Sequence, residues 1–123
     1  IKAYPFLRRK DFQVIYNQPE LSRFSPAKDE LKLKLRSKFS LPKDKIIVST
    51  AGTNFMLKGV AQLISSLSLL PENFYVIVAG KRNPAYFLRL ARKLNVVDRV
   101  QFMGEVKDMV SFYRASDIFV LPT

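Results

Sequence analysis

The chain has 123 residues and a formal net charge of +11, and 48% of its residues are hydrophobic. This predicts one domain with a real core, or part of a domain. Cysteine and histidine are both absent from the sequence, which excludes disulfides, thiolate nucleophiles, zinc–thiolate sites and a Ser-His-Asp triad. No stretch is long and apolar enough to cross a bilayer, and the first residues do not resemble a signal peptide, so we expect a cytoplasmic protein. The positive charge favours phosphate-bearing partners without choosing among nucleotides, nucleic acid and anionic lipid.

The N-terminal part predicts a short strand and then a basic helix. Residues 1–12 are interpreted as a linker or inter-domain remnant, and 13–123 as the domain. Phe12–Tyr16 is a strand candidate, and Ser25-Pro26 indicates a helix start, with Ser25 as the N-cap. The predicted helix 27–39 has an apolar face and a basic surface, made respectively by Ala27, Leu31, Leu35 and Phe39 and by Lys28, Lys32, Arg36 and Lys38. A solvated face is the commonest role for such cations, although the same surface could bind lipid or nucleic acid.

From Ile46 onward, buried strands alternate with helices. The predicted strands run from Ile46 to the break at Gly52 and over Phe74–Ala79, Arg99–Met103 and Ile118–Leu121. Helices are predicted over 59–70, after Asn83-Pro84, and after Asp108, which can cap the last one. This alternation predicts an α/β fold, a Rossmann-like parallel sheet with helices on both faces. The final apolar strand would be a bare sheet edge, so we expect the chain to be a piece of a longer protein or to need a partner.

Three of the four glycines, Gly52, Gly80 and Gly104, directly follow predicted strands. In a parallel sheet the carboxyl ends of the strands share one edge, and ligands bind in a crevice there. A tight turn explains any one of these glycines, but three at one edge favour a ligand site. Lys58, at the start of the helix that follows, either reaches a pyrophosphate over the helix N-terminus or is a solvated surface lysine. Neither a Walker A loop nor a Gly-x-Gly-x-x-Gly fingerprint occurs in the sequence.

The predicted rim of this crevice carries charged residues. Lys81 and Arg82 follow Gly80, and Glu105 follows Gly104. Each is more often simply exposed, although Glu105 could accept a hydrogen bond from a ribose or a base. Asp117 is expected to cap or turn the chain before the last strand. No convincing pair of catalytic carboxylates is present, so no catalytic residue is predicted in the chain.

Five segments stand in the order and at the spacing of a known family: Ile15–Pro26, Ala51–Val60, Val76–Gly80, Val100–Gly104 and Ala115–Pro122. Together they resemble the C-terminal domain of the retaining glycosyltransferases of family 4, which have the two-domain GT-B architecture. The segment Asn54-Phe-x-x-Lys-Gly-Val60 looks closest to the lipopolysaccharide-core glucosyltransferase branch. The sequence departs from the family pattern at Gln18, at Glu20 and at Thr53, where the family usually has an arginine.

The resemblance implies a partial nucleotide-sugar-binding domain of an enzyme that transfers a hexose, with retention, to a glycan or glycolipid. It implies no cofactor and no metal, and assigns donor binding to Gly52, Thr53, Lys58, Gly80, Lys81, Gly104, Glu105 and Val106. The family's sugar-holding glutamates and its acceptor-binding N-terminal domain lie outside these residues, so the chain alone is expected to be inactive. Peripheral contact with the inner face of a membrane is a further candidate property. The alternative interpretation is a non-enzymatic basic α/β module that binds nucleic acid or an anionic membrane surface.

Overall fold

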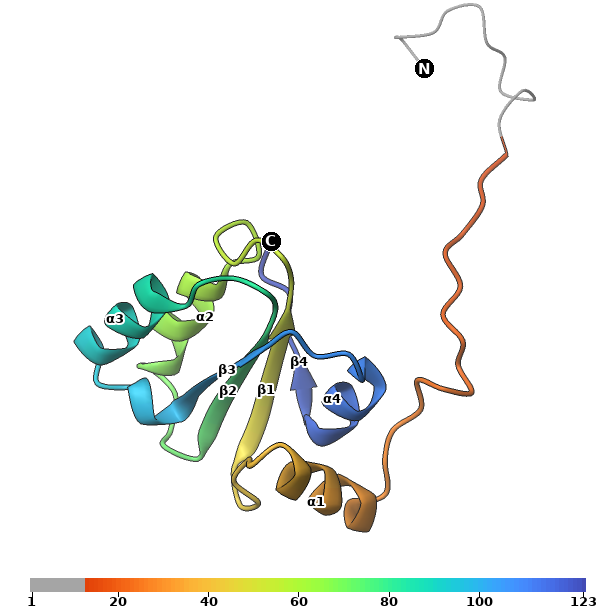
Figure 1. Cartoon of the computed structure of the whole chain (residues 1–123), viewed down its shortest axis with the longest axis horizontal. Coiled ribbons are helices and arrows are strands. Elements are labelled where there is room, and N and C mark those ends of the chain that lie inside the picture. The colour runs from red at the N-terminus through yellow and green to blue at the C-terminus, as the bar shows by residue number, and fades with distance from the viewer. Residues whose placement is uncertain (1–12) are drawn as a thin grey trace, which may run out of the picture.

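The computed structural model describes residues 13–123, and they form a parallel four-stranded sheet with helices on both faces (Figure 1). The strand order is β3-β2-β1-β4. The strands are β1 (Ile46–Ala51), β2 (Phe74–Ala79), β3 (Val100–Gly104) and β4 (Ile118–Phe119). The predicted Rossmann-like α/β fold is therefore confirmed.

Each face of the sheet has its own hydrophobic core. Successive side chains of a strand point to opposite faces, so β1 sends Ile47 into one core and Val48 into the other. The helices are α1 (Asp29–Lys38), α2 (Val60–Leu67), α3 (Ala85–Lys93) and α4 (Met109–Ala115). α2 and α3 cover the Val48 face, and α1 and α4 cover the Ile47 face (Figure 1). β1 and β2 are thus buried on both sides, which explains why neither alternates between apolar and polar residues. The two polar residues of β1, Ser49 and Thr50, are buried as well.

The strand register brings the carboxyl ends of β1, β2 and β3 level with one another. β1 and β2 pair from Ile46↔Phe74 to Ala51↔Ala79 without a shift. β2 and β3 pair with one irregularity, after which Ala79 stands opposite Gly104. A β-bulge of this kind bends the strand locally, and here it lies directly before the turn that Gly104 begins. The loops after the three strands therefore leave the sheet at a common edge.

The segment before α1 differs most from the sequence prediction. Phe12 lies outside the described residues, and 13–16 form no strand, so the predicted strand Phe12–Tyr16 is wrong for its described part. Ser25 is not the N-cap either, because α1 begins at Asp29 and Lys28 precedes it. The Ser25 hydroxyl and carbonyl both accept hydrogen bonds from Arg114 of α4, at 3.1 Å each, so this segment is held by α4 instead.

The other differences concern the ends of elements. The predicted helix 59–70 is helical only to Leu67, β3 begins at Val100, and β4 ends at Phe119. Only one further ladder bond follows β4, from Val120 N–H to the Ser49 carbonyl, before the chain turns away at Pro122. The predicted cap at Asp108 is confirmed, since its carboxylate accepts a hydrogen bond from Ser111 N–H at 3.0 Å.

Candidate functional site

The turns that follow β1, β2 and β3 are joined by backbone hydrogen bonds. Gly52 N–H donates to the Ala79 carbonyl at 3.0 Å, and Gly80 N–H donates to the Gly104 carbonyl at 2.7 Å. The sheet edge at Gly52, Gly80 and Gly104 is called the glycine edge below. The structure thus brings together the three glycines that the sequence predicted to share one edge.

Gly80 has to be a glycine for two separate reasons. Its φ is +153°, in a region that side-chain-bearing residues rarely adopt. A Cβ at this position would also overlap the carbonyl oxygen of Gly52 and lie 2.7 Å from a ring carbon of Phe55. The β1 and β2 turns therefore touch backbone to backbone at Gly80. Gly104 also has a positive φ, of +66°, but a Cβ there would face open space.

Lys58 lies against the first of these turns. A Cβ on Gly52 would be 2.7 Å from the Lys58 Cγ and 3.5 Å from its Cδ, so the lysine stem packs directly over the glycine. Gly52 itself has no positive φ, so the space it leaves, rather than its backbone conformation, is what the lysine requires. Within residues 13–123, the Lys58 ammonium takes part in no ion pair.

The loop before α2 forms the N-terminus of this helix. Gly59 is the N-cap, with φ +65°, and a Cβ there would lie 2.8 Å from the Pro122 Cγ. The N–H groups of Lys58, Gly59 and Val60 all donate to loop carbonyls, those of Asn54, Met56 and Phe55 respectively. These three N–H groups are therefore not free for an anion.

The remaining predicted site residues lie on the loops of the same edge. The Lys81 ammonium and the Glu105 carboxylate form an ion pair at 3.5 Å, with side chains 83% and 60% exposed, across the loops that follow β2 and β3. Exposed pairs are weak, so a ligand could redirect either partner at little cost. Thr53 is exposed, whereas Val106 packs partly against the core beside α4. Two cavities of the described structure, of 450 and 470 Å³, are lined by none of the eight residues, and the exposed side chains of Thr53, Lys81 and Glu105 leave this edge open to solvent.

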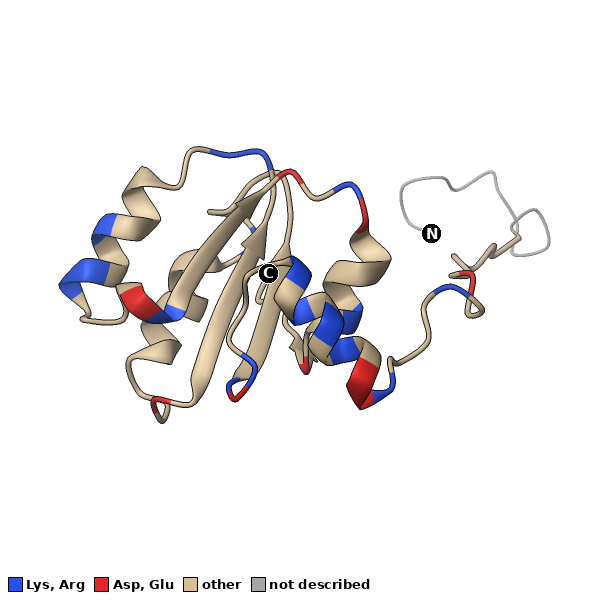
Figure 2. Ribbon diagram, turned by 60° about the horizontal axis from the view of Figure 1, so that its bottom comes forward, with Lys and Arg blue, Asp and Glu red and all other residues tan. Residues whose placement is uncertain are grey.

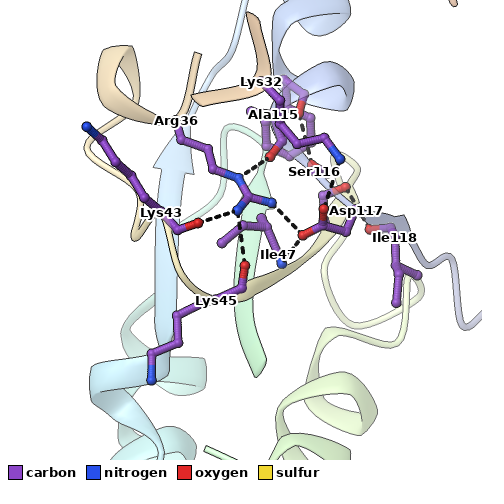
Figure 3. Close-up of polar contacts among 11 residues, drawn as sticks. Lys32, Arg36, Lys43, Lys45, Ile47, Ala115, Ser116, Asp117 and Ile118 are labelled. Atoms are coloured by element: carbon purple, nitrogen blue, oxygen red, sulfur yellow. Dashed lines mark hydrogen bonds and ion pairs between the residues drawn. The ribbon is translucent and has the colours of Figure 1, made fainter. Parts of the chain in front are cut away.

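The opposite end of the sheet is held by a polar cluster that the sequence did not reveal (Figure 3). Arg36 of α1 is 5% exposed and donates to the carbonyls of Ala115, Lys43 and Lys45 at 2.9–3.1 Å, and to the Asp117 carboxylate. Asp117 also accepts from Ile47 N–H at 2.7 Å and from Lys32 at 3.0 Å. Arg36 therefore ties α1 and α4 to the starts of β1 and β4.

This cluster corrects the predicted basic face of helix 27–39. Arg36 is buried, and Lys32 is paired with Asp117, so two of the four predicted surface cations have structural partners. Burial alone would raise the pKa of Asp117, but the hydrogen bonds from Ile47 and Lys32 and the charges of Arg36 and Lys32 lower it overall. Asp117 is thus a structural anion rather than a simple turn residue, and α1 offers a weaker basic stripe than expected.

Two further properties concern only the described part of the chain. None of its helices combines the length and the apolar character needed to span a bilayer. No three potential metal-ligating side chains gather within it.

Comparisons with known proteins agree with this architecture. The chain is 29% identical, over 94% of its length and 27% of the relative's, to a protein named D-inositol 3-phosphate glycosyltransferase from Mycolicibacterium smegmatis. The structure of WaaG, described as a glycosyltransferase involved in lipopolysaccharide biosynthesis, superposes with a TM-score of 0.81 at 26% identity and covers 94% of this chain. Anabaena HepE in complex with UDP shares the fold, with a TM-score of 0.82 at 20% identity over 94% of the chain.

The chain spans about a third or less of these proteins, 33% of each of the two solved structures and 27% of the mycobacterial relative. The family model described as "Glycosyl transferases group 1" matches residues 32–123, which include every strand and the whole glycine edge. The chain therefore belongs to the glycosyl transferases group 1 family.

Proposed function

We propose that this chain is part of the nucleotide-sugar-binding domain of a retaining glycosyltransferase. The observation that carries the proposal is the position of Lys58, which forms no ion pair within residues 13–123 and whose stem rests on Gly52 where the three strand-end turns meet. Family membership supports it, and so do the solved structures of HepE, which are described as complexes with UDP and with UDP-glucose. We expect the donor diphosphate to lie along the glycine edge.

Lys58 acts electrostatically in this proposal. When the sugar leaves, negative charge develops on the nucleoside diphosphate, and a fixed ammonium beside it stabilises that charge. Because Thr53 stands where the family pattern usually has arginine, Lys58 carries most of this role. We propose that the ammonium, and not a bound metal or cofactor, neutralises the leaving group.

The loops after β2 and β3 would hold the rest of the nucleotide. Gly104 leaves its outer side open, so a ligand can approach the backbone of the Gly104–Val106 loop closely. We propose that this loop binds the base, with Glu105 available for a ribose or base hydroxyl or N–H group. Gly80 and Lys81 would form the rim beside it.

The complete enzyme, in this proposal, transfers a hexose to a glycan or glycolipid at the cytoplasmic side of a membrane. The chain contributes no catalytic residue, since the sugar-holding glutamates and the acceptor half belong to other parts of the family's architecture. The 123 residues alone should therefore bind a donor without turning it over.

Titration of the ¹⁵N-labelled chain with UDP tests the proposal. We expect millimolar or tighter binding, with shifts around Gly52, Lys58 and Gly104. Lys58→Ala should weaken binding about tenfold, or about 1.4 kcal/mol, which is close to the lower end of the roughly 1.5–3 kcal/mol that a hydrogen bond to a charged group contributes. Lys43→Ala, an exposed lysine at the opposite end of β1, is the matched control and should leave the affinity unchanged. Shifts confined to α1, with none at the glycine edge, would contradict the proposal.

A further inference from the structure

The loop that carries Lys58 is attached to the core by one side chain. Of residues 53–58, which lead from β1 to the N-cap of α2, Phe55 alone is buried, and it is 1% exposed. Its ring packs edge-on against Phe87 of α3, with centroids 5.6 Å apart, and at a tilt against Phe102 of β3, with centroids 5.7 Å apart. Aromatic pairs of this kind stabilise a contact beyond the area that they bury. The loop is thus fixed to two elements that are distant from it in the sequence.

The Phe55 ring also lies against the contact between the first two strand-end turns. A Cβ on Gly80 would be 2.7 Å from the Phe55 Cε1 and would overlap the Gly52 carbonyl oxygen. The ring and the Gly52 backbone therefore both press on Gly80, which has no side chain to obstruct them. One side chain in this way joins the Lys58 loop to the turn after β2 as well as to β3 and α3.

Ion pairs play no part in holding this loop to the sheet. None of the four strands contains Lys, Arg, Asp or Glu, and Figure 2 shows the charged residues on the helices and loops around them. Within residues 13–123, no side chain of the loop 53–58 forms an ion pair. The position of the loop therefore depends on backbone hydrogen bonds and on apolar packing, in which Phe55 is the buried member.

Backbone hydrogen bonds connect Phe55 to Lys58. The N–H group of Lys58 donates to the Asn54 carbonyl at 2.9 Å, and that of Val60 donates to the Phe55 carbonyl at 3.0 Å. The Asn54 side chain in turn accepts a hydrogen bond from Leu57 N–H at 3.3 Å. Because these bonds close one compact turn, a displacement of Phe55 is passed on to Lys58.

We propose that Phe55 is a positioning residue for donor binding, an inference that rests on the proposed function. Its ring, held by Phe87 and Phe102, fixes the turn that places the Lys58 ammonium beside the diphosphate. A cation on a mobile loop loses conformational freedom when it binds a ligand, and this entropic cost lowers the affinity. A cation that is fixed beforehand avoids the cost and already faces the charge that develops as the sugar leaves. Phe55 acts through Lys58 and, being buried, touches no ligand itself.

UDP titration of Phe55→Leu in the 123-residue chain tests this inference. Leucine keeps the position apolar but removes both ring contacts, so the affinity for UDP should fall about three- to tenfold, at most as far as in Lys58→Ala. The matched control is Phe112→Leu, which shortens an equally buried phenylalanine in the core on the other face of the sheet. The control should lower the melting temperature similarly and leave the affinity for UDP unchanged. Equal losses of affinity in both variants would overturn the inference, because general destabilisation would then explain them.

Combining Phe55→Leu with Lys58→Ala separates positioning from other effects on the site. Once the ammonium is gone, Phe55→Leu should cost no further affinity for UDP. The same loss with and without Lys58 would overturn the inference. Phe87→Leu loosens the ring contact from α3 without altering the loop, and should give a smaller loss of the same kind, so the test does not depend on one variant. Unchanged affinity in both Phe55→Leu and Phe87→Leu would also overturn it.

A measurement without ligand separates this inference from the proposed function. In ¹⁵N relaxation of the free chain, Phe55→Leu should lower the order of the Leu57, Lys58 and Gly59 amides and leave α4 unchanged; unaltered order in the loop would overturn the inference. If the original chain binds no UDP, the proposed function fails, and the relaxation result still decides whether Phe55 fixes the loop. If Lys58→Ala weakens UDP binding and Phe55→Leu does not, the positioning role alone fails.

Discussion

Replacing Gly52 by alanine tests whether the first turn and Lys58 work as one unit. The backbone of Gly52 tolerates a side chain because its φ is not positive, so the only obstacle is the Lys58 stem. The new Cβ would stand 2.7 Å from the Lys58 Cγ, and ordinary contact begins at 3.4 Å, so the stem must retreat. A shift at Cγ moves the ammonium, at the far end of the side chain, by a larger amount. We therefore expect Gly52→Ala to cost nearly as much UDP affinity as Lys58→Ala, about tenfold or about 1.4 kcal/mol.

A double-mutant cycle makes this prediction decisive. The Lys58 Cβ would lie 3.6 Å from the new methyl group, which is ordinary contact, so alanine at both positions fits without collision. Gly52→Ala should then cost nothing further in the Lys58→Ala background, which gives a coupling energy close to the whole effect of Lys58. Calorimetric titration with UDP measures all four proteins. Equal losses in both backgrounds would refute the reasoning, and so would a Gly52→Ala variant that binds UDP as well as the original chain.

Gly80→Ala provides the contrasting control for this cycle. Its Cβ would overlap a backbone oxygen of Gly52 rather than a side chain, and its φ of +153° disfavours alanine. A backbone cannot move aside as a lysine stem can, so this variant should lose thermal stability before it loses any specific contact with the nucleotide. Gly52→Ala should therefore lower mainly the affinity for UDP, and Gly80→Ala should lower mainly the thermal stability.

Two predictions concern the polar cluster at the other end of the sheet, the second of them together with Asp108, the cap of α4. Arg36→Met should lower the free energy of unfolding by about 3 kcal/mol in urea titrations, because three carbonyls and the Asp117 carboxylate lose the hydrogen bonds that Arg36 donates. The control is Lys34→Ala, which removes an exposed pair with Glu30 and should change the free energy of unfolding by less than about 0.5 kcal/mol. A loss below about 1 kcal/mol for Arg36→Met would contradict this account. Stability should also fall as the pH drops from about 4 towards 2, because the folded-state pKa of Asp117 is lowered from 3.8 and that of Asp108 is lowered to about 2. Acid titration followed by circular dichroism measures this loss, and Asp117→Asn should flatten the profile.

The parts of the fold that local sequence determines were predictable. The mainly apolar segments Ile46–Ala51 and Phe74–Ala79 are long enough to be buried strands, and a glycine directly after each marks where it ends. Level carboxyl ends follow from parallel pairing, so the shared position of the three glycine turns could be inferred before any coordinates. The binding roles of these residues stay predictions.

The parts that depend on distant partners were not predictable. The burial of Arg36 is decided by Ala115 and Asp117, which lie 79 and 81 residues further along the chain. The only signal for this contact was a lone aspartate directly before the last strand, and many such residues simply turn the chain. The predicted strand Phe12–Tyr16 failed in its described part for the opposite reason, because its composition suits a strand but the described sheet ends at β4 and β3 without pairing to 13–16. A strand requires hydrogen-bonding partners as well as propensity.

The two ends of the sheet use positive charge differently. At the amino ends of β1 and β4, Arg36 and Lys32 share the carboxylate of Asp117, so their charges stabilise the fold. At the carboxyl ends, the described residues supply an acidic partner only for Lys81 and leave Lys58 and Arg82 without one. A cation without an internal anion retains its attraction for an external one, and the open edge gives that anion access. This contrast supports the proposed donor site at the glycine edge, where β1 and β2 end.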